Sequence, residues 1–191
     1  MPTQPESQDA LALVTGAPGW LGTRLVEALV NGLPDHPDLA ATTRARVRCL
    51  VLPDADASAL ERLPGVSIVR GDVTNPASLD AFVAEARGAA LFHCAGIIHP
   101  RRAADFDAVN AHGTRNVLAA ARQAGVRRIV HTSSNSPFGA NPSRDHVFTE
   151  SAPYHPYMGY GRSKMTAEQA VFEANRAGAI EGVVVRAPWF Y

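Results

Sequence analysis

The sequence predicts an α/β fold, in which a doubly wound parallel sheet is covered by helices on both faces. Six short apolar runs, rich in β-branched residues and bounded by Gly, Pro or Asp, are typical of buried strands. Helical patterns lie between these runs, and this alternation favours parallel pairing. A glycine-rich stretch follows directly after the first run, as at a turn from strand to helix.

The predicted strands and helices alternate along the chain. The expected strands, each predicted to be buried on both faces, span residues 11–16, 47–52, 66–72, 90–96, 126–134 and 182–188. Two helices carry apolar residues on one face and are followed by a glycine that can end them: Leu21, Leu25 and Leu29 before Gly32, and Val117, Leu118 and Ala121 before Gly125.

The organisation is that of one domain. Residues 1–10 are polar and are expected to form a flexible N-terminus, and residues 11–191 hold all the predicted elements. Segment 31–46 is longer than the roughly 2–6 residues that usually connect such elements. It is interpreted as a surface excursion or a short helix, without a function.

Composition excludes several classes of protein. The 191 residues are 46% hydrophobic and 19% charged, with zero formal net charge, so neither nucleic acid nor a membrane is expected as partner. Cys49 and Cys94 lie far apart in apolar contexts, which fits a reducing, cytoplasmic location. The seven histidines show no metal-ligand spacing, so no metal is expected. His93 and His131 fall within strands and are expected to be buried and hydrogen-bonded.

The stretch "TGAPGWLG" places Gly16, Gly19 and Gly22 between the first strand and the first helix. Amide groups and the positive end of the helix dipole would face a pyrophosphate there, as in a Rossmann-type dinucleotide site. A tight turn without a ligand is the alternative. Asp72 ends the third strand, where it would accept a hydrogen bond from an adenine amino group or simply stabilise a turn.

Tyr160 and Lys164 are four residues apart in a helical pattern and would share one face. A neighbouring ammonium favours the phenolate, and lowering a tyrosine pKa by about three units takes roughly 4 kcal/mol. Such a tyrosine could exchange a proton with a substrate hydroxyl. The alternative is a packed tyrosine beside a solvated lysine.

A wider pattern favours the catalytic interpretation. The motifs "TGAPGWLG", "HCAG", "VNAHGT", "HTSSNSPFG" and "YGRSK" follow one another in order. In these motifs the chain resembles the extended short-chain dehydrogenase/reductase family, over about residues 11 to 191. The resemblance implies a Rossmann-type fold, a small-molecule substrate and NAD or NADP as cofactor.

The resemblance also implies the roles of individual residues. Those expected to bind the cofactor are Gly16, Gly19, Gly22 and the amides of Trp20 and Leu21 at the pyrophosphate, Asp72 and Val73 at the adenine, Ala95 and Gly96 at the ribose and nicotinamide, Asn110 as support, and Pro188 beside the nicotinamide. Ser134 would hydrogen-bond the reacting oxygen, Tyr160 would be the general acid/base, and Lys164 would bind the nicotinamide ribose and lower the tyrosine pKa.

The choice between NAD and NADP stays open. The acidic residue that selects NAD and the arginine that selects NADP would align with Val51 and Leu52. Asp54 and Asp56 follow slightly later, whereas the arginines that precede this point are Arg44, Arg46 and Arg48. Family members continue past "RAPWFY" into a small substrate-binding region, which is expected to be missing from this chain.

Four functions are considered for these motifs. A dehydrogenase or reductase acting on an alcohol/ketone pair is preferred, and a nucleotide-sugar epimerase is second. A dehydratase is disfavoured because Asn135 and Ser136, rather than an acid, follow Ser134. A non-catalytic dinucleotide sensor is the alternative of another class. The family also implies a homodimer, with helices that begin near Asn110 and Tyr160 forming a four-helix bundle.

Overall fold

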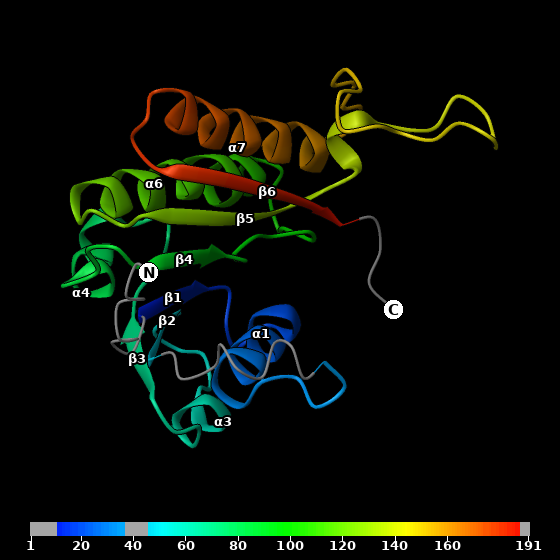
Figure 1. The fold of residues 1–191 in the computed structure, drawn as a ribbon. Helices are drawn as coiled ribbons and strands as arrows, with labels where there is room; N and C mark the ends of the chain where they lie inside the picture. Colours follow the sequence, from blue (N-terminus) through cyan, green and yellow to red (C-terminus); the bar gives the residue numbers. More distant parts are fainter. Residues whose placement is uncertain (1–10, 37–45, 188–191) are drawn as a thin grey trace, which may run out of the picture.

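A computed structural model of the chain describes residues 11–36 and 46–187. It contains a six-stranded parallel sheet with the order β3-β2-β1-β4-β5-β6 (Figure 1). The strands are β1 (Leu11–Thr15), β2 (Arg46–Val51), β3 (Val66–Arg70), β4 (Ala90–His93), β5 (Arg128–Ser134) and β6 (Glu181–Ala187). All six lie at the predicted places, so the doubly wound α/β fold is confirmed.

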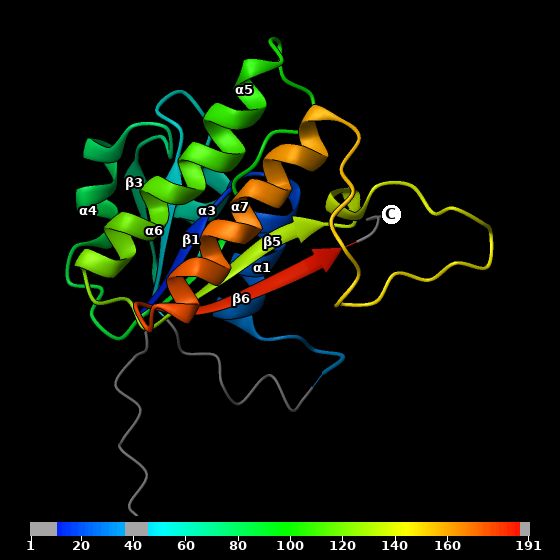
Figure 2. The same ribbon diagram turned by 90° about the horizontal axis from the view of Figure 1, so that it is seen from above.

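Helices cover both faces of the sheet (Figures 1 and 2). One core cluster, which includes Phe82, Val117 and Val171, packs the helices α4, α6 and α7 against one face. A second cluster, which includes Val26 and Leu60, packs α1 and α3 against the other. The helical elements are α1 (Trp20–Asn31), α3 (Ser58–Glu61), η1 (Pro76–Leu79), α4 (Asp80–Val83), α5 (Ala104–Phe106), η2 (Asp107–His112), α6 (Gly113–Gln123), η3 (Ser136–Phe138) and α7 (Gly159–Arg176).

The strand order reverses its direction between β1 and β4, which are hydrogen-bonded neighbours with Thr15 opposite His93. In sheets of this kind, the loops that leave two such strands diverge and open a crevice at the carboxyl ends. The turn after β1 and the segment after β4 therefore flank the expected ligand site.

The two edge strands differ from their prediction. Burial on both faces was expected of all six strands, but every second residue of β6 is exposed and β3 is only partly covered. Val183 and Val185 keep 42% and 48% of their surface exposed. The expectation was wrong there because an apolar run does not tell a central strand from an edge strand.

Both helix ends agree with the sequence. Gly32 and Gly125 take positive φ angles of 77° and 72° directly after α1 and shortly after α6. The expectations for residues 1–10, and for most of segment 31–46, fall outside the described residues. Among the described helices, none has the length and apolar character needed to cross a membrane.

Candidate active site

The glycine turn brings the loops after β1 and β4 into contact. Gly16 has φ +87°, and a Cβ there would lie 2.5 Å from the carbonyl carbon of Cys94. A Cβ on Gly22 would lie 2.6 Å from the Gly16 carbonyl oxygen. Larger residues would therefore separate the start of α1 from the turn. Gly19 precedes α1, and no side chain caps this helix terminus.

The amino end of α1 is oriented as an anion site requires, since the first-turn amides of a helix have no acceptor within the helix. Trp20 is the first residue of α1 and its surface is 61% exposed, while Leu21 is half-buried.

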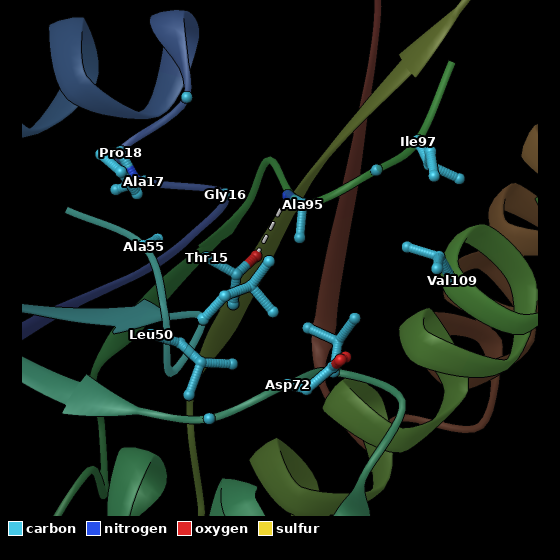
Figure 3. A pocket seen from close by; sticks show the side chains of 15 residues that line it. Thr15, Gly16, Ala17, Pro18, Leu50, Ala55, Asp72, Ala95, Ile97 and Val109 are labelled. Carbon is cyan, nitrogen blue, oxygen red and sulfur yellow. Dashed lines mark hydrogen bonds between the residues drawn. The ribbon is translucent and has the colours of Figure 1, made fainter. Parts of the chain in front are cut away.

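A cavity of about 320 Å³ lies at this edge of the sheet (Figure 3). Of the residues predicted to bind the cofactor, six line it: Gly16, Gly19, Asp72, Val73, Ala95 and Gly96. Six others lie outside the wall: Trp20, Leu21, Gly22, Asn110, Tyr160 and Lys164. Pro188 lies outside the described residues. Sequence reasoning missed the apolar part of the wall, which includes Leu50, Ala55, Ile97 and Val109. Leu50 lies near the carboxyl end of a predicted strand, and this position could have indicated it as part of the wall.

Asp72 combines its two predicted roles in position. It lines the cavity, and its Oδ1 accepts a hydrogen bond from the Thr74 amide at 2.8 Å, as in a turn. The adenine role is therefore compatible with, and not an alternative to, the turn.

Asn110 connects the cavity wall to α7. It lies in the π-helical segment η2, within continuous helical structure rather than at a helix start. Its Oδ1 accepts from the Ile97 amide at 2.8 Å, and its Nδ2 donates to the Ile97 carbonyl and to Ser163 Oγ, both at 3.0 Å. Ser163 in turn donates to the Tyr160 carbonyl at 2.8 Å. Asn110 thus fixes the loop after β4 relative to the helix that carries Tyr160.

Ser134 and Tyr160 come from β5 and α7, respectively. Ser134 ends β5, and its Oγ lies 3.0 Å from Ser136 Oγ and 3.3 Å from Asn135 Oδ1. Burial raises the pKa of Tyr160 above its usual value near 10, while a hydrogen bond with Ser134 lowers it. The net direction is opposite to the expectation from sequence.

Lys164 explains this difference. It is buried on α7, and its Nζ donates to the Thr132 carbonyl at 2.5 Å and lies 3.3 Å from His131 Nε2. Its ammonium is thus bound to β5. Desolvation lowers the pKa of Lys164 to about 8, against the opposing effects of Glu168 and Cys94. A Cβ on Gly96 would lie 4.0 Å from Nζ, which places the ammonium next to a residue of the cavity wall.

A buried ionic network lies one turn further along α7, and sequence reasoning did not identify it. Glu168 accepts hydrogen bonds from Ser133 at 2.5 Å, Tyr154 at 2.8 Å and Arg186 at 2.8 Å. The Arg186 guanidinium also lies over the Phe138 ring, 4.8 Å from its centroid. The network joins β5, β6 and the segment before α7.

Comparisons with known proteins agree with this geometry. Residues 12–191 match the NAD dependent epimerase/dehydratase family. The chain is 54% identical over 95% of its length to the uncharacterized protein y4nL of Sinorhizobium fredii, and 36% identical over 93% to sterol demethylase protein B of Methylococcus capsulatus.

A solved structure is also similar. It is DesIV, a dTDP-glucose 4,6-dehydratase from Streptomyces venezuelae with NAD and TYD bound, at 30% identity and a TM-score of 0.77, over 92% of this chain and 55% of that one. The chain spans about half the length of the curated relatives it matches, 51% and 52% for the two above. The match extends over nearly all of the chain, so the protein belongs to the NAD dependent epimerase/dehydratase family, within the extended short-chain dehydrogenases/reductases.

Proposed function

We propose that this chain binds NAD across the carboxyl edge of its sheet and exchanges hydride at a hydroxyl- or carbonyl-bearing carbon of a small molecule. One observation carries the proposal: the glycine turn and Gly96 line the same cavity, and a Cβ on Gly96 would lie 4.0 Å from Lys164 Nζ. Tyr160 lies one helical turn before Lys164 on α7.

The residues present fit a dinucleotide. Gly16 and Gly19 and the uncapped start of α1 suit a pyrophosphate, and the small residues Ala95 and Gly96 leave space for a ribose. NAD supplies the hydride acceptor when bound. The solved relative DesIV has NAD bound, which supports the same assignment here.

NAD is favoured over NADP by the charge of the cavity. Among the described residues that line it, Asp72 is the only charged one. Arg70 approaches the segment after β2, but its Nη1 donates to the carbonyls of Leu52 and Ala55. Arg48 donates to the Phe82 and Ala84 carbonyls instead of reaching a phosphate. Arg44 lies outside the described residues.

Tyr160 would act as the general acid or base. Burial favours its protonated form, which suits donation of a proton to a carbonyl oxygen. The Ser134 hydroxyl would orient the same oxygen, and the positive charge of Lys164 would stabilise the phenolate as it forms.

Reduction or oxidation of an alcohol/ketone pair is our first choice of reaction. Asn135 and Ser136 follow Ser134 and contact its hydroxyl, so its described hydrogen-bond partners include no carboxyl group for elimination of water. The resemblance to sterol demethylase protein B supports an apolar alcohol as substrate. Epimerisation is the second candidate, since the family description includes it.

The test uses two matched tyrosine variants. We expect Tyr160→Phe to lower kcat at least about 100-fold, while NAD affinity changes little. Tyr157→Phe is the control, because Tyr157 lies three residues earlier and 66% of its surface is exposed. NADH formation is measured with a panel of secondary alcohols, sterols and nucleotide sugars. Tight NAD binding without turnover of any substrate would favour the non-catalytic sensor instead.

A homodimer through α6 and α7 is part of the same proposal. The two helices lie side by side (Figure 2), and a groove of about 490 Å³ between α5 and α7 is lined by Phe106, Arg162 and Met165. A second copy would place its own helix pair there. Light scattering should give twice the chain mass, and Met165→Glu should give the monomer; a monomeric wild type would reject the dimer.

A further inference from the structure

Two buried histidines face each other across neighbouring strands and have different environments. His93 of β4 and His131 of β5 are register partners, with ring centroids 5.2 Å apart. His93 is fully paired: its Nδ1 lies 2.7 Å from Thr15 Oγ1 and its Nε2 lies 2.9 Å from Thr114 Oγ1. This agrees with the expectation from sequence.

His131 is paired on one side only. Its Nε2 lies 3.3 Å from Lys164 Nζ, and because an ammonium only donates, Nε2 must be the acceptor. The ring proton then sits on Nδ1, which is buried and has no partner in the described part of the chain. An unpaired buried donor is unfavourable for folding, so His131 is poorly explained as a purely structural residue.

We propose that His131 is a positioning residue, whose Nε2 and the neighbouring Thr132 carbonyl hold the Lys164 ammonium at the cofactor side of the sheet. The two contacts together fix the position of the ammonium, since His131 and Thr132 are adjacent on β5 and each offers it one acceptor. The consequence for catalysis rests on the proposed function, in which Lys164 acts on the nicotinamide ribose and on Tyr160.

The groups around Lys164 Nζ show why the acceptor His131 Nε2 matters for the charge of the ammonium. The titratable groups that interact with it are His93 and Cys94 from β4 and its loop, His131 from β5, and Glu168 from α7. Glu168 is the carboxylate among them, and it is engaged by Arg186 of β6. Burial lowers the pKa of both histidines, which keeps them neutral at pH 7.

The hydrogen bonds described for the ammonium are to two neutral acceptors, His131 Nε2 and the Thr132 carbonyl, while Glu168 and Cys94 favour its charged form electrostatically. Since the pKa of Lys164 is already lowered to about 8, loss of one acceptor would bring its deprotonation into the neutral range.

The sequence offers a direct probe, because Lys164 is the only lysine among the 191 residues. Labelling with ¹³Cε-lysine gives one side-chain NMR signal, whose titration reports Lys164 without added cofactor. The signal is assigned by its absence in Lys164→Met.

Three substitutions of His131 separate the acceptor from the volume of the ring. His131→Gln can place an amide oxygen near the position of Nε2, whereas His131→Asn is too short and His131→Phe has no acceptor. We expect the Gln variant to titrate close to wild type, and the Asn and Phe variants about one pH unit lower. His93→Gln, on the neighbouring strand, should leave the Lys164 titration unchanged.

Thermal melting of each variant identifies any that fail to fold. If folded His131→Asn and His131→Phe proteins titrate as the wild type does, the proposal is wrong. If they shift and the Gln variant restores the value, it is supported.

NAD affinity at pH 8 then separates this proposal from the proposed function. We expect the Kd for NAD to rise about tenfold in His131→Phe and to recover in His131→Gln. A shifted titration with unchanged NAD affinity would support the positioning of Lys164 by His131 and count against the role of Lys164 in cofactor binding.

Discussion

At the scale of single residues, Asn110 shows how one buried amide can stabilise a whole edge of the cavity. Its side chain satisfies both backbone groups of Ile97 and one hydroxyl of α7. We expect Asn110→Ala to lower the free energy of unfolding by about 2–3 kcal/mol, because it leaves several partly buried polar groups unpaired. Urea denaturation measures the change. Ser163→Ala, which removes one of these partners, should cost about 1 kcal/mol; equal costs for both variants would contradict this account.

His93 predicts a pH dependence of folding. Burial, and secondarily the charge of Lys164, lowers the pKa of His93 to about 3 in the folded protein, against about 6.5 when unfolded. The unfolded state therefore binds more protons between these values, and stability present above pH 6.5 is lost as the pH falls toward 3.

His93→Gln cannot titrate, so it isolates this contribution. The stability difference between wild type and His93→Gln should decrease by about 1.4 kcal/mol per pH unit below pH 6.5. Urea denaturation from pH 7 to pH 4 tests it. If this difference stays constant with pH, folding does not lower the pKa of His93.

At the scale of elements, the Glu168 network determines how α7 sits on the sheet. Glu168 is fully buried and bonded to Arg186, whereas Arg24 and Glu27 form an exposed pair on α1. We expect Glu168→Ala to cost about 3–5 kcal/mol, because it removes a buried carboxylate that accepts from Ser133, Tyr154 and Arg186. Arg186 then keeps only the exposed carboxylate of Glu150 as an ion-pair partner. Glu27→Ala, the matched control, should cost less than about 1 kcal/mol. Comparable losses of melting temperature in the two variants would contradict the assignment.

The elements also show what the sequence could predict. The strands and the ends of α1 and α6 follow from local patterns, since β-branched runs and terminal glycines act within a few residues. The placement of Tyr160 and Lys164 on one turn of a helix followed from their spacing for the same reason.

Long-range contacts escaped prediction. Residues 133, 154, 168 and 186 meet in one network although they are far apart in the chain. The acceptors of Lys164 belong to β5, and they are determined by how α7 packs against that strand. The direction of the Tyr160 pKa was mispredicted because burial, which raises it, cannot be read from spacing alone.

At the scale of the whole molecule, the proposed ligand site draws on both the first and the second half of the chain. The cavity wall combines residues at the carboxyl ends of β1, β2, β3 and β4 with Val109 of η2. Ser134, Tyr160 and Lys164 come from the other half. A dinucleotide that bridges the two halves should therefore stabilise the folded chain as a unit, because ligand that binds only the folded state shifts the unfolding equilibrium.

This leads to a prediction about the cofactor that needs no substrate. NAD at about 100 times its Kd should stabilise the chain by about 2.7 kcal/mol, which corresponds to a rise in melting temperature of about 5–11 °C for a protein of this size. NADP at the same concentration should give a smaller rise, because the described cavity wall has no cationic side chain for the extra phosphate and carries the carboxylate of Asp72.

The variant Asp72→Asn tests the source of this preference. In Asp72→Asn the gap between the melting temperatures with NAD and with NADP should narrow, since the Thr74 amide keeps an acceptor while the negative charge is lost. Asp80→Asn, on α4 and outside the cavity wall, should leave the gap unchanged. Equal or greater stabilisation by NADP would reject the preference for NAD. Arg70 would then be the candidate phosphate ligand, because its guanidinium contacts the segment after β2.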